Sequence, residues 1–382
     1  GVARVEGPEP VSFRASSLGE VKMGRILVVN AGSSSLKTAL FDGAKRVFEI
    51  DVLEISGAAR IKVIDGEDKS EEKLSVVDHH HALALALDRY SDLGAPAHKI
   101  DGAGHRIVHG GSEFSAPVRL DPETVRRIDG YSSLAPLHNP PAVNAIHALE
   151  ELAPALPQVG CFDTAFHATA PEIATTFAIP KDLRDAGYRR YGFHGLSYEG
   201  LVEKLPDLLG KPLPERVLAL HLGNGASLCA IRNGLSVATS MGYSPVDGLV
   251  MGTRSGAIDP IVALKIAAER GVEEAERILT RESGLWALSG GVSDMRALLS
   301  SDSEAARFAI EHYCYWAARQ AGSALAAMGG VDVIAFTGGI GENAGPVRDG
   351  IMTHLEWTGA SVCVVECDEE AVVAQATRRL LE

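Results

Sequence analysis

The strongest constraint on the fold is a pattern that occurs twice in the chain. Residues 25–41 read RILVVNAGSSSLKTALF, and residues 216–231 read RVLALHLGNGASLCAI. In each segment an apolar run, a turn of small residues and a second apolar run predict a strand–turn–strand hairpin that lets a ligand approach the backbone. Two such hairpins indicate a duplicated α/β unit with a cleft between the copies. Two unrelated hairpins would give the same pattern, and the pattern alone favours neither interpretation.

Length and composition narrow the fold class. The chain has 382 residues, which is longer than a domain with a single hydrophobic core usually is, so two domains are expected. Its 46% hydrophobic residues, 5% aromatic residues and 40 glycines are typical of an ordered, loop-rich α/β protein. A coiled coil or a disordered chain would have a different composition.

Charge and cysteine content bear on partners and compartment. The formal charge of -14 argues against a nucleic-acid-binding surface. The five cysteines include no CxxC pair, which predicts reduced cytosolic thiols rather than a disulfide framework or a zinc site. No apolar run is long enough to predict a membrane span. Residues 1–22 lack the apolar stretch of a signal peptide and are interpreted as an N-terminal extension.

Further elements are indicated along the chain. A short buried strand framed by glycines is expected within residues 102–111. Asp121 followed by Pro122 predicts the start of a helix that ends near Asp129. The other expected elements are a helix over 142–152, a connection or hinge over 205–215, a helix over 304–328, a strand over 331–337 and an amphipathic helix after Asp368.

Three glycine-rich turns are candidate phosphate or nucleotide contacts. They are NAGSSSLK at 30–37, HLGNGAS at 221–227 and GGIGEN at 338–343, and each comes directly after or at the end of a predicted strand. The first offers several N–H and O–H donors and the charge of Lys37, but it lacks P-loop spacing. One such turn is more often a plain tight turn. Three in one chain indicate a nucleotide.

Two arginines and one aspartate occupy unusual positions. Arg106 lies within an apolar strand and Arg254 lies among small residues, where a guanidinium is costly unless it is paired or faces a polar cleft. Each could form a structural ion pair, or the two could clamp a transferring phosphoryl group. Asp163 follows an apolar stretch, as catalytic carboxylates at strand ends do, although a turn-capping role fits equally well.

Two histidines lie in loops rich in glycine, proline and aromatic residues. His138 is in PLHNPP and His194 is in YGFHG. An imidazole at either position could donate a hydrogen bond to a phosphoryl oxygen. Lone loop histidines more often have only a structural role, and that alternative stays open here.

Taken together, these segments resemble the acetate kinase family of acetate and propionate kinases, within the superfamily of sugar kinases, actin and heat-shock ATPases. The motifs occur in the family's order and span nearly the whole chain. They are VVNAGSSSLK, GHRIVHGG, LAPLHNPP, FDTAFH, RRYGFHG, HLGNGAS, SMGYSPVDGLVMGTRSGAIDP and FTGGIGEN. The resemblance is specific for the family and much less so for the carboxylate.

The resemblance implies an α/β fold of two related actin-like (ribonuclease H-like) domains with a nucleotide cleft between them. The N-terminal domain would comprise residues 23–164 together with 369–382. The C-terminal domain, residues 165–368, would carry the main ATP-binding segments. Residues 1–22 have no counterpart in the family.

The resemblance also implies roles for individual residues. The catalytic set is Asp163, His194, Arg254, Arg106, His138 and Asn224. The carboxylate would bind Arg106, with its methyl group in an apolar pocket formed by Val108, Leu137, Phe193 and Pro245.

The implied ligands of ATP and of a metal complete the set. The ATP-binding residues are Ser33, Ser35, Lys37, His221, Leu222, Gly223, Asn224, Gly225, Asp294, Met295, Arg296, Gly339, Ile340, Gly341, Glu342 and Asn343. Asn30 and Glu369 would hold Mg²⁺, or alternatively Mn²⁺. The segment from Ile351 to Glu369 is shorter than is usual in the family. The match at Glu369 is thin, because only the double Glu is left of a longer pattern.

The activity implied is reversible, Mg²⁺-dependent transfer of phosphate from ATP to acetate, giving ADP and acetyl phosphate for acetyl-CoA synthesis. Propionate or butyrate are alternative acceptors, because one extra methylene changes such a pocket by only ~1–3 kcal/mol. A non-catalytic ATP-binding protein of the actin type is the distant alternative, against which Arg106, Asp163 and Arg254 argue. A cytoplasmic homodimer is also implied, without nucleic-acid or membrane partners.

Overall fold

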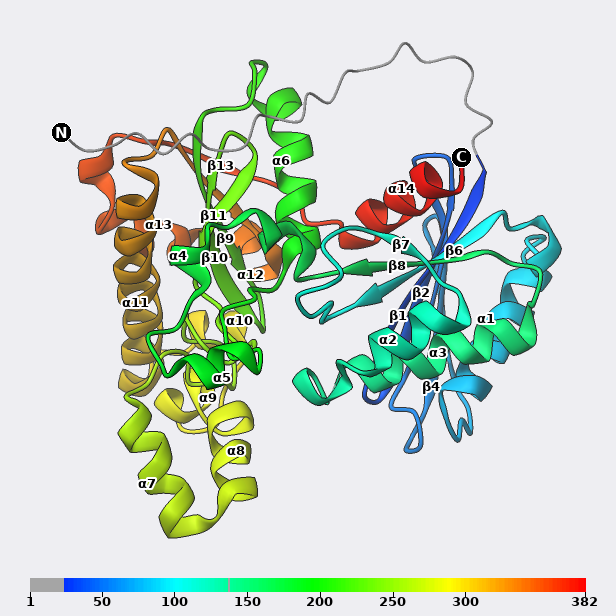
Figure 1. Cartoon of the computed structure of the whole chain (residues 1–382), viewed down its shortest axis with the longest axis horizontal. Helices are drawn as coiled ribbons and strands as arrows, with labels where there is room; N and C mark the ends of the chain where they lie inside the picture. Colours follow the sequence, from blue (N-terminus) through cyan, green and yellow to red (C-terminus); the bar gives the residue numbers. More distant parts are fainter. Residues whose placement is uncertain (1–23, 137) are drawn as a thin grey trace.

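The computed structural model describes residues 24–136 and 138–382, so the expected extension at 1–22 lies outside the described residues. Two β-sheets form the centres of two lobes (Figure 1). The first sheet contains β1 (Arg25–Gly32), β2 (Ser35–Asp42), β3 (Lys45–Leu53), β4 (Arg60–Asp65), β5 (Asp68–Lys73), β6 (Gly102–Ile107), β7 (Val118–Arg119) and β8 (Gln158–Phe162). The second contains β9 (Arg216–Leu222), β10 (Ala226–Arg232), β11 (Leu235–Thr239), β12 (Val333–Thr337) and β13 (Ser361–Val364).

The two sheets share the arrangement of a five-strand core, to which the first sheet adds β4, β5 and β7. The first has the order β5-β4-β3-β2-β1-β6-β8-β7 and the second has the order β11-β10-β9-β12-β13. In each, three consecutive strands pair antiparallel, and the first of them also pairs parallel with a later strand, which pairs parallel with the next. The duplicated α/β unit is therefore confirmed, and two unrelated hairpins are excluded.

Helices cover both faces of the first sheet. On one face lie α1 (His79–Asp92) and α3 (Asn139–Leu152), which share a core with β1 and β2. On the other lies the C-terminal helix α14 (Glu369–Leu381), which Figure 1 shows returning to the N-terminal lobe. A Cβ at Gly104 of β6 would lie 2.2 Å from Thr377 Oγ1, so a glycine is needed for α14 to pack this closely.

The second sheet lies between α11 (Glu304–Met328) and α6 (Gly195–Leu209), which pack on opposite faces. The shorter helices are α2 (Pro122–Asp129), α4 (Glu172–Thr175), α5 (Lys181–Asp185), α7 (Pro260–Arg270), α8 (Val272–Arg281), α9 (Gly284–Ser289), α10 (Met295–Leu299), α12 (Gly338–Asn343) and α13 (Gly345–Thr353). In the part of the chain that the structure describes, no helix combines the length and the apolar character needed to cross a membrane.

Most sequence-based elements are confirmed, with differences at three prolines. The helix expected to begin near residue 142 begins at Asn139, because Pro140 and Pro141 occupy its first turn, where no N–H donor is required. The proposed hinge at 205–215 is partly wrong, because its first residues form the last turn of α6, with Pro206 inside that helix. The GGIGEN turn is the short helix α12.

Two buried histidines predict how stability depends on pH. Burial lowers the pKa of His105 and of His167 to about 4, against the usual value of 6.5. As pH falls from 6.5 to 4, the unfolded chain therefore takes up protons that the folded chain does not. Each buried imidazole should therefore lower the free energy of unfolding by on the order of 3 kcal/mol when the pH has fallen to 4.

Urea unfolding at several pH values measures this loss. His167 bonds Ser236 Oγ and the Phe193 carbonyl, both at 2.9 Å, so His167→Gln keeps polar atoms there and should make the pH dependence shallower. An unfolding free energy unchanged between pH 7 and pH 4.5 in the wild type would contradict the buried, neutral state of these imidazoles.

Candidate active site

The parallel strands of the first sheet bring three predicted site residues to one edge. β1 is parallel to β6, and β6 is parallel to β8, so the carboxyl ends of the three strands meet. Asn30 lies near the end of β1, Arg106 near the end of β6, and Asp163 directly follows β8. Ligands of open α/β sheets bind at such an edge.

Arg106 is held by a fixed set of oxygen atoms. Its Nη2 and Nε donate to the two carboxylate oxygens of Asp163, at 2.6 and 3.2 Å. Its Nη1 lies 3.4 Å from Asn30 Oδ1, and its Nε lies 3.4 Å from Glu369 Oε2 at the start of α14. Burial raises the pKa of Asp163, and the charge of Arg106 opposes that shift. A guanidinium does not lose its proton, so the bidentate pair keeps Asp163 ionised.

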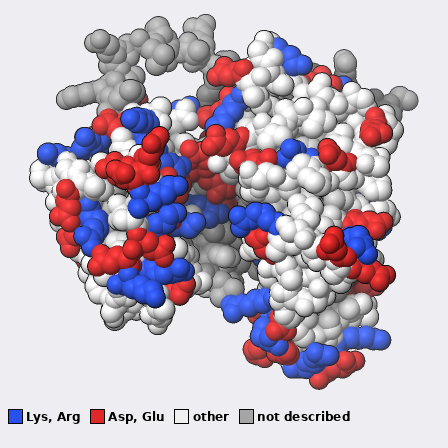
Figure 2. Space-filling view, turned by 180° about the vertical axis from the view of Figure 1, so that it is seen from behind, with Lys and Arg blue, Asp and Glu red and all other residues white. Residues whose placement is uncertain are grey.

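A cleft of about 500 Å³ opens beside this cluster, between the two lobes. Figure 2 shows the hollow between the lobes, bordered by both acidic and basic side chains. The predicted site residues that line it are Asn30, Lys37, Arg106, His194, His221, Gly339, Glu342 and Glu369. It is also lined by Gly338, the first residue of the GGIGEN segment, and by residues for which no role was predicted, namely Val28, Arg46, Cys367, Asp368, Glu370 and Val373.

Arg46 shows why Glu369 points into the cleft. Its guanidinium bonds Asp368 at 2.5 Å and Glu370 at 2.7 Å, the two carboxylates that flank Glu369. These two bonds fix the start of α14 against β3. Nothing in the pattern of β3 marked Arg46, although the run of three acidic residues at 368–370 was a signal for a basic partner.

Arg254 differs from Arg106 in having no carboxylate partner among the described residues. Its Nη1 donates to the Pro245 carbonyl at 3.1 Å, and burial alone lowers its pKa. A Cβ at Gly225 would lie 3.4 Å from both Arg254 Nη1 and His194 Nε2. Gly225 therefore leaves room for a ligand between the half-buried guanidinium of Arg254 and an imidazole, where an anion would be favoured.

His194 is oriented by a chain of hydroxyl groups. Its Nδ1 lies 2.9 Å from Ser227 Oγ, which lies 2.5 Å from the Tyr198 hydroxyl. Burial is the main cause that lowers the pKa of His194 well below its usual value. If Tyr198 donates to Ser227 and Ser227 donates to Nδ1, the proton of the neutral ring is on Nε2, which then points a donor at the space beside Gly225.

His194 also adopts an unusual backbone conformation. Its φ of 60° lies in the left-handed region, which a residue with a side chain rarely occupies. Its ring stacks on His221 with centroids 4.2 Å apart. Burial lowers the pKa of His221 to about 4, so both stacked rings are neutral at pH 7. Strain of this kind is found where surrounding structure fixes a functional side chain.

The predicted apolar pocket is assembled only in part. Val108 packs against the hydrophobic cluster that contains Phe193, and the carbonyl of Pro245 binds Arg254. Leu137 lies outside the described residues. His138 is half-buried, and burial, followed by the charges of Arg254 and Arg106, lowers its pKa. That electrostatic influence associates His138 with the two arginines.

The remaining predicted ATP contacts lie in four separate segments. Leu222, Gly223 and Asn224 lie at the β9–β10 turn next to His221, and Ile340, Gly341 and Asn343 belong to α12 next to Gly339. Ser33 and Ser35 lie at the β1–β2 turn. Asp294 instead caps α10 and pairs with Arg296, whose side chain is 88% exposed, while Met295 is buried in the core. Apart from His221 and Gly339, none of the residues named here lines the cleft in the described structure, and Asp294, Met295 and Arg296 are also not adjacent in sequence to a residue that does.

Oxygen donors suited to Mg²⁺ are present in the cleft. Asn30 and Glu369 both line it, one with an amide oxygen and the other with a carboxylate. Mg²⁺ is bound in proteins by one or two such oxygens together with substrate phosphates and water. The residues present therefore fit the Mg²⁺ ion that the family resemblance implies.

Comparisons with known proteins agree with this geometry. A model described as the acetokinase family matches residues 25–379. The acetate kinase of Rhodopseudomonas palustris is 43% identical over 348 residues, which is 88% of this chain and 87% of the relative. The crystal structure of Porphyromonas gingivalis acetate kinase matches with a TM-score of 0.88 at 34% identity, covering 94% of this chain and 100% of that one. A propionate kinase from Francisella tularensis matches with a TM-score of 0.88 at 33% identity over the same shares. The chain belongs to the acetokinase family.

Proposed function

We propose that this chain transfers the γ-phosphoryl group of ATP to acetate, reversibly, giving acetyl phosphate and ADP. The carrying observation is the cleft in which Arg106, held by Asp163, lies beside Asn30 and Glu369. Membership of the acetokinase family supports ATP as donor and acetate as acceptor.

Arg106 binds the acceptor carboxylate. Asp163 occupies its Nε and Nη2, so the edge at Nη1 is the one presented to a substrate carboxylate. Acetate is ionised at neutral pH and attacks without losing a proton, so no general base is required. Asp163 therefore orients Arg106 and does not take a proton. The methyl group of acetate enters the apolar slot beside Val108, Phe193 and Pro245.

Arg254 and the Nε2–H of His194 contact the phosphoryl group in transfer. Both atoms point at the space left by Gly225, and fixed donors in a site sheltered from water stabilise charge more strongly than water does. Asn224 and His138 lie beside this path. Asn30 and Glu369 hold Mg²⁺, or Mn²⁺ in its place, which when bound neutralises phosphate charge. ATP lies along His221–Gly225 and Gly339–Asn343, with Lys37 on the phosphate side.

Other parts of the proposal rest on the family resemblance and on charge. The chain acts as a homodimer in the cytoplasm, and its product enters acetyl-CoA synthesis. Nucleic acid is not a partner, given the charge of -14.

The N-terminal domain comprises residues 23–164 with 369–382, in agreement with the packing of α14 on β6 and β8.

The activity itself is tested by trapping acetyl phosphate with hydroxylamine in the presence of ATP, Mg²⁺ and acetate. Coloured hydroxamate should accumulate only when all three are present. A chain that binds ATP without forming hydroxamate would be a nucleotide-binding protein of the actin type instead.

Replacing Arg254, which has no carboxylate partner among the described residues, should remove most of the activity. Arg254→Ala should lower kcat by about 10²–10³-fold, because a fixed donor to the transition state is lost. Arg277→Ala, in an exposed ion-paired helix, is the matched control and should keep the wild-type rate. A folded Arg254→Ala variant with the wild-type kcat would contradict the proposed contact between Arg254 and the phosphoryl group.

Acceptor preference tests the apolar slot. We expect kcat/KM to fall from acetate to propionate to butyrate. Each added methylene group should raise the free energy of the bound transition state by about 1–3 kcal/mol. Val108→Ala should enlarge the slot and raise kcat/KM for propionate relative to kcat/KM for acetate. Propionate is the second candidate acceptor, because a propionate kinase matches this fold with a TM-score of 0.88. A higher kcat/KM for propionate or butyrate than for acetate would make that acid, and not acetate, the acceptor.

A further inference from the structure

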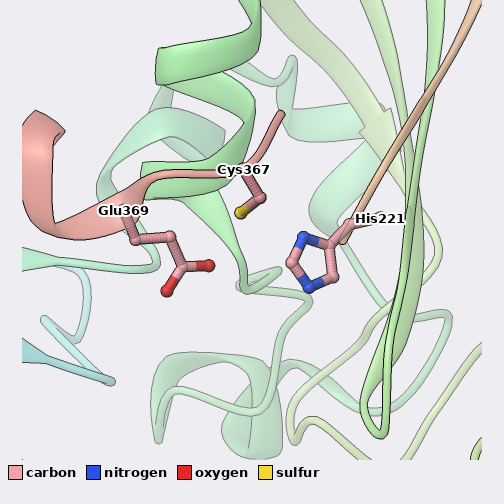
Figure 3. Close-up of side chains that lie close together, drawn as sticks. All are labelled: His221, Cys367 and Glu369. Atoms are coloured by element: carbon pink, nitrogen blue, oxygen red, sulfur yellow. The ribbon is translucent and has the colours of Figure 1, made fainter. Parts of the chain in front are cut away.

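Cys367 lines the cleft but takes no part in the proposed phosphoryl transfer. It immediately precedes Asp368, the N-cap of α14, and it lies close to the side chains of His221 and Glu369. One ligand atom from each of the three residues lies within 4.8 Å of the others. Figure 3 shows the sulfur, the imidazole and the carboxylate turned toward the same space.

We propose that His221, Cys367 and Glu369 form a site for a thiophilic divalent cation of the Zn²⁺ class. Zn²⁺ bonds of about 2.0–2.3 Å place tetrahedral ligands about 3.5 Å apart, so small side-chain rotations close this set around an ion. Three protein ligands leave a fourth position for water or phosphate. Arg106 contacts Glu369 through Oε2, which leaves the other carboxylate oxygen for the ion.

Ser197 provides the outer hydrogen bonds that such a site requires. Its Oγ lies 2.8 Å from His221 Nδ1 and 3.4 Å from Cys367 Sγ. Figure 3 draws Nδ1 on the side of the sulfur, so the His221 ring must turn for Nε2 to bind the ion. Nδ1–H would then donate to Ser197, and the serine hydroxyl would donate to the thiolate. Each donor is then used once. Metal-bound histidines commonly have this kind of partner at their second nitrogen.

The thiol is also held in place by its surroundings. The backbone N–H of Cys367 donates to Glu342 Oε1 at 3.0 Å. The buried hydroxyl of Thr337 lies beside the thiol and has no other hydrogen-bond partner among the described residues. A thiolate would accept from this hydroxyl. Cys367 binds the ion as a thiolate, and its proton leaves to solvent.

The donor set separates this site from the Mg²⁺ site. Mg²⁺ prefers oxygen ligands, whereas sulfur and imidazole nitrogen favour Zn²⁺. Glu369 belongs to both sets, and His221 lies on the proposed ATP path, so Zn²⁺ and the Mg²⁺–nucleotide complex exclude each other. Zn²⁺ is therefore an inhibitor that competes with the nucleotide. This consequence rests on the proposed function, but the binding of Zn²⁺ does not.

Zinc binding is measured on the full chain, stripped of metal, by competition with a chromophoric chelator. The wild type should bind one Zn²⁺ at this site. Cys367→Ser should weaken that binding at least about tenfold, and Ser197→Ala should weaken it about 10–100-fold. Cys363→Ser changes a half-buried cysteine in the neighbouring β13 and is the matched control, with wild-type affinity and activity.

Co²⁺ gives a second readout that needs no variant. A thiolate bound to Co²⁺ absorbs in the near ultraviolet, so this band should appear in the wild type and disappear when Zn²⁺ is added. It decides the matter if Cys367→Ser fails to fold. Absence of the band, or equal Zn²⁺ affinity in the wild type and a folded Cys367→Ser, overturns the site.

Inhibition is scored separately in the hydroxamate assay at fixed Mg²⁺. Zn²⁺ should inhibit the wild type and Cys363→Ser alike, and raising Mg²⁺–ATP should relieve the inhibition. Inhibition that Mg²⁺–ATP does not relieve overturns the shared-ligand claim. A chain that binds Zn²⁺ through Cys367 yet forms no hydroxamate with Mg²⁺ alone would refute the proposed function and leave the zinc site standing.

Discussion

The ion pair between Arg106 and Asp163 connects the elements that form the cleft. A guanidinium inside an apolar strand is costly unless its donors are occupied, and two of them are bound by a carboxylate whose side chain is only 2% exposed. The same guanidinium contacts Asn30 on β1 and Glu369 on α14. One charged group thus fixes three strands and the C-terminal helix relative to one another. Removing Asp163 would leave the arginine buried without its main counter-charge.

The groups around Gly225, next to His194 of the cleft, differ in charge from the Arg106 cluster. Arg106 has a carboxylate partner, and Arg254 has none among the described residues. The histidines beside Arg254 are neutral, because burial and the neighbouring guanidinium groups disfavour their protonated forms. An anion that enters beside Gly225 therefore meets one uncompensated cation and oriented neutral donors. Such an arrangement stabilises charge that develops during transfer without a reorganisation of solvent.

Local patterns in the sequence predicted much of this, and long-range contacts account for what they missed. The hairpins, α11 and α14 follow from apolar periodicity and from turn and cap residues, which are local properties. Asp163 was placed at a strand end because the residues before it are apolar. Whether Arg106 and Arg254 were paired could not be predicted, because pairing depends on which strands become neighbours. Arg46 and Ser197 were missed for the same reason, since their partners Asp368 and Cys367 are distant in sequence. The absence of a CxxC pair argued against a zinc site, whereas the site proposed at His221, Cys367 and Glu369 would take its ligands from separate segments.

The most direct test of the central claim is a double-mutant cycle on Arg106 and Asp163, measured as kcat/KM for acetate. If Asp163 acts by orienting Arg106, then Asp163→Asn should add little to the loss already caused by Arg106→Ala, and the coupling free energy should approach the whole effect of the Asp163 substitution. Additive losses from the two substitutions would contradict this account, because they would assign Asp163 an independent role in the chemistry.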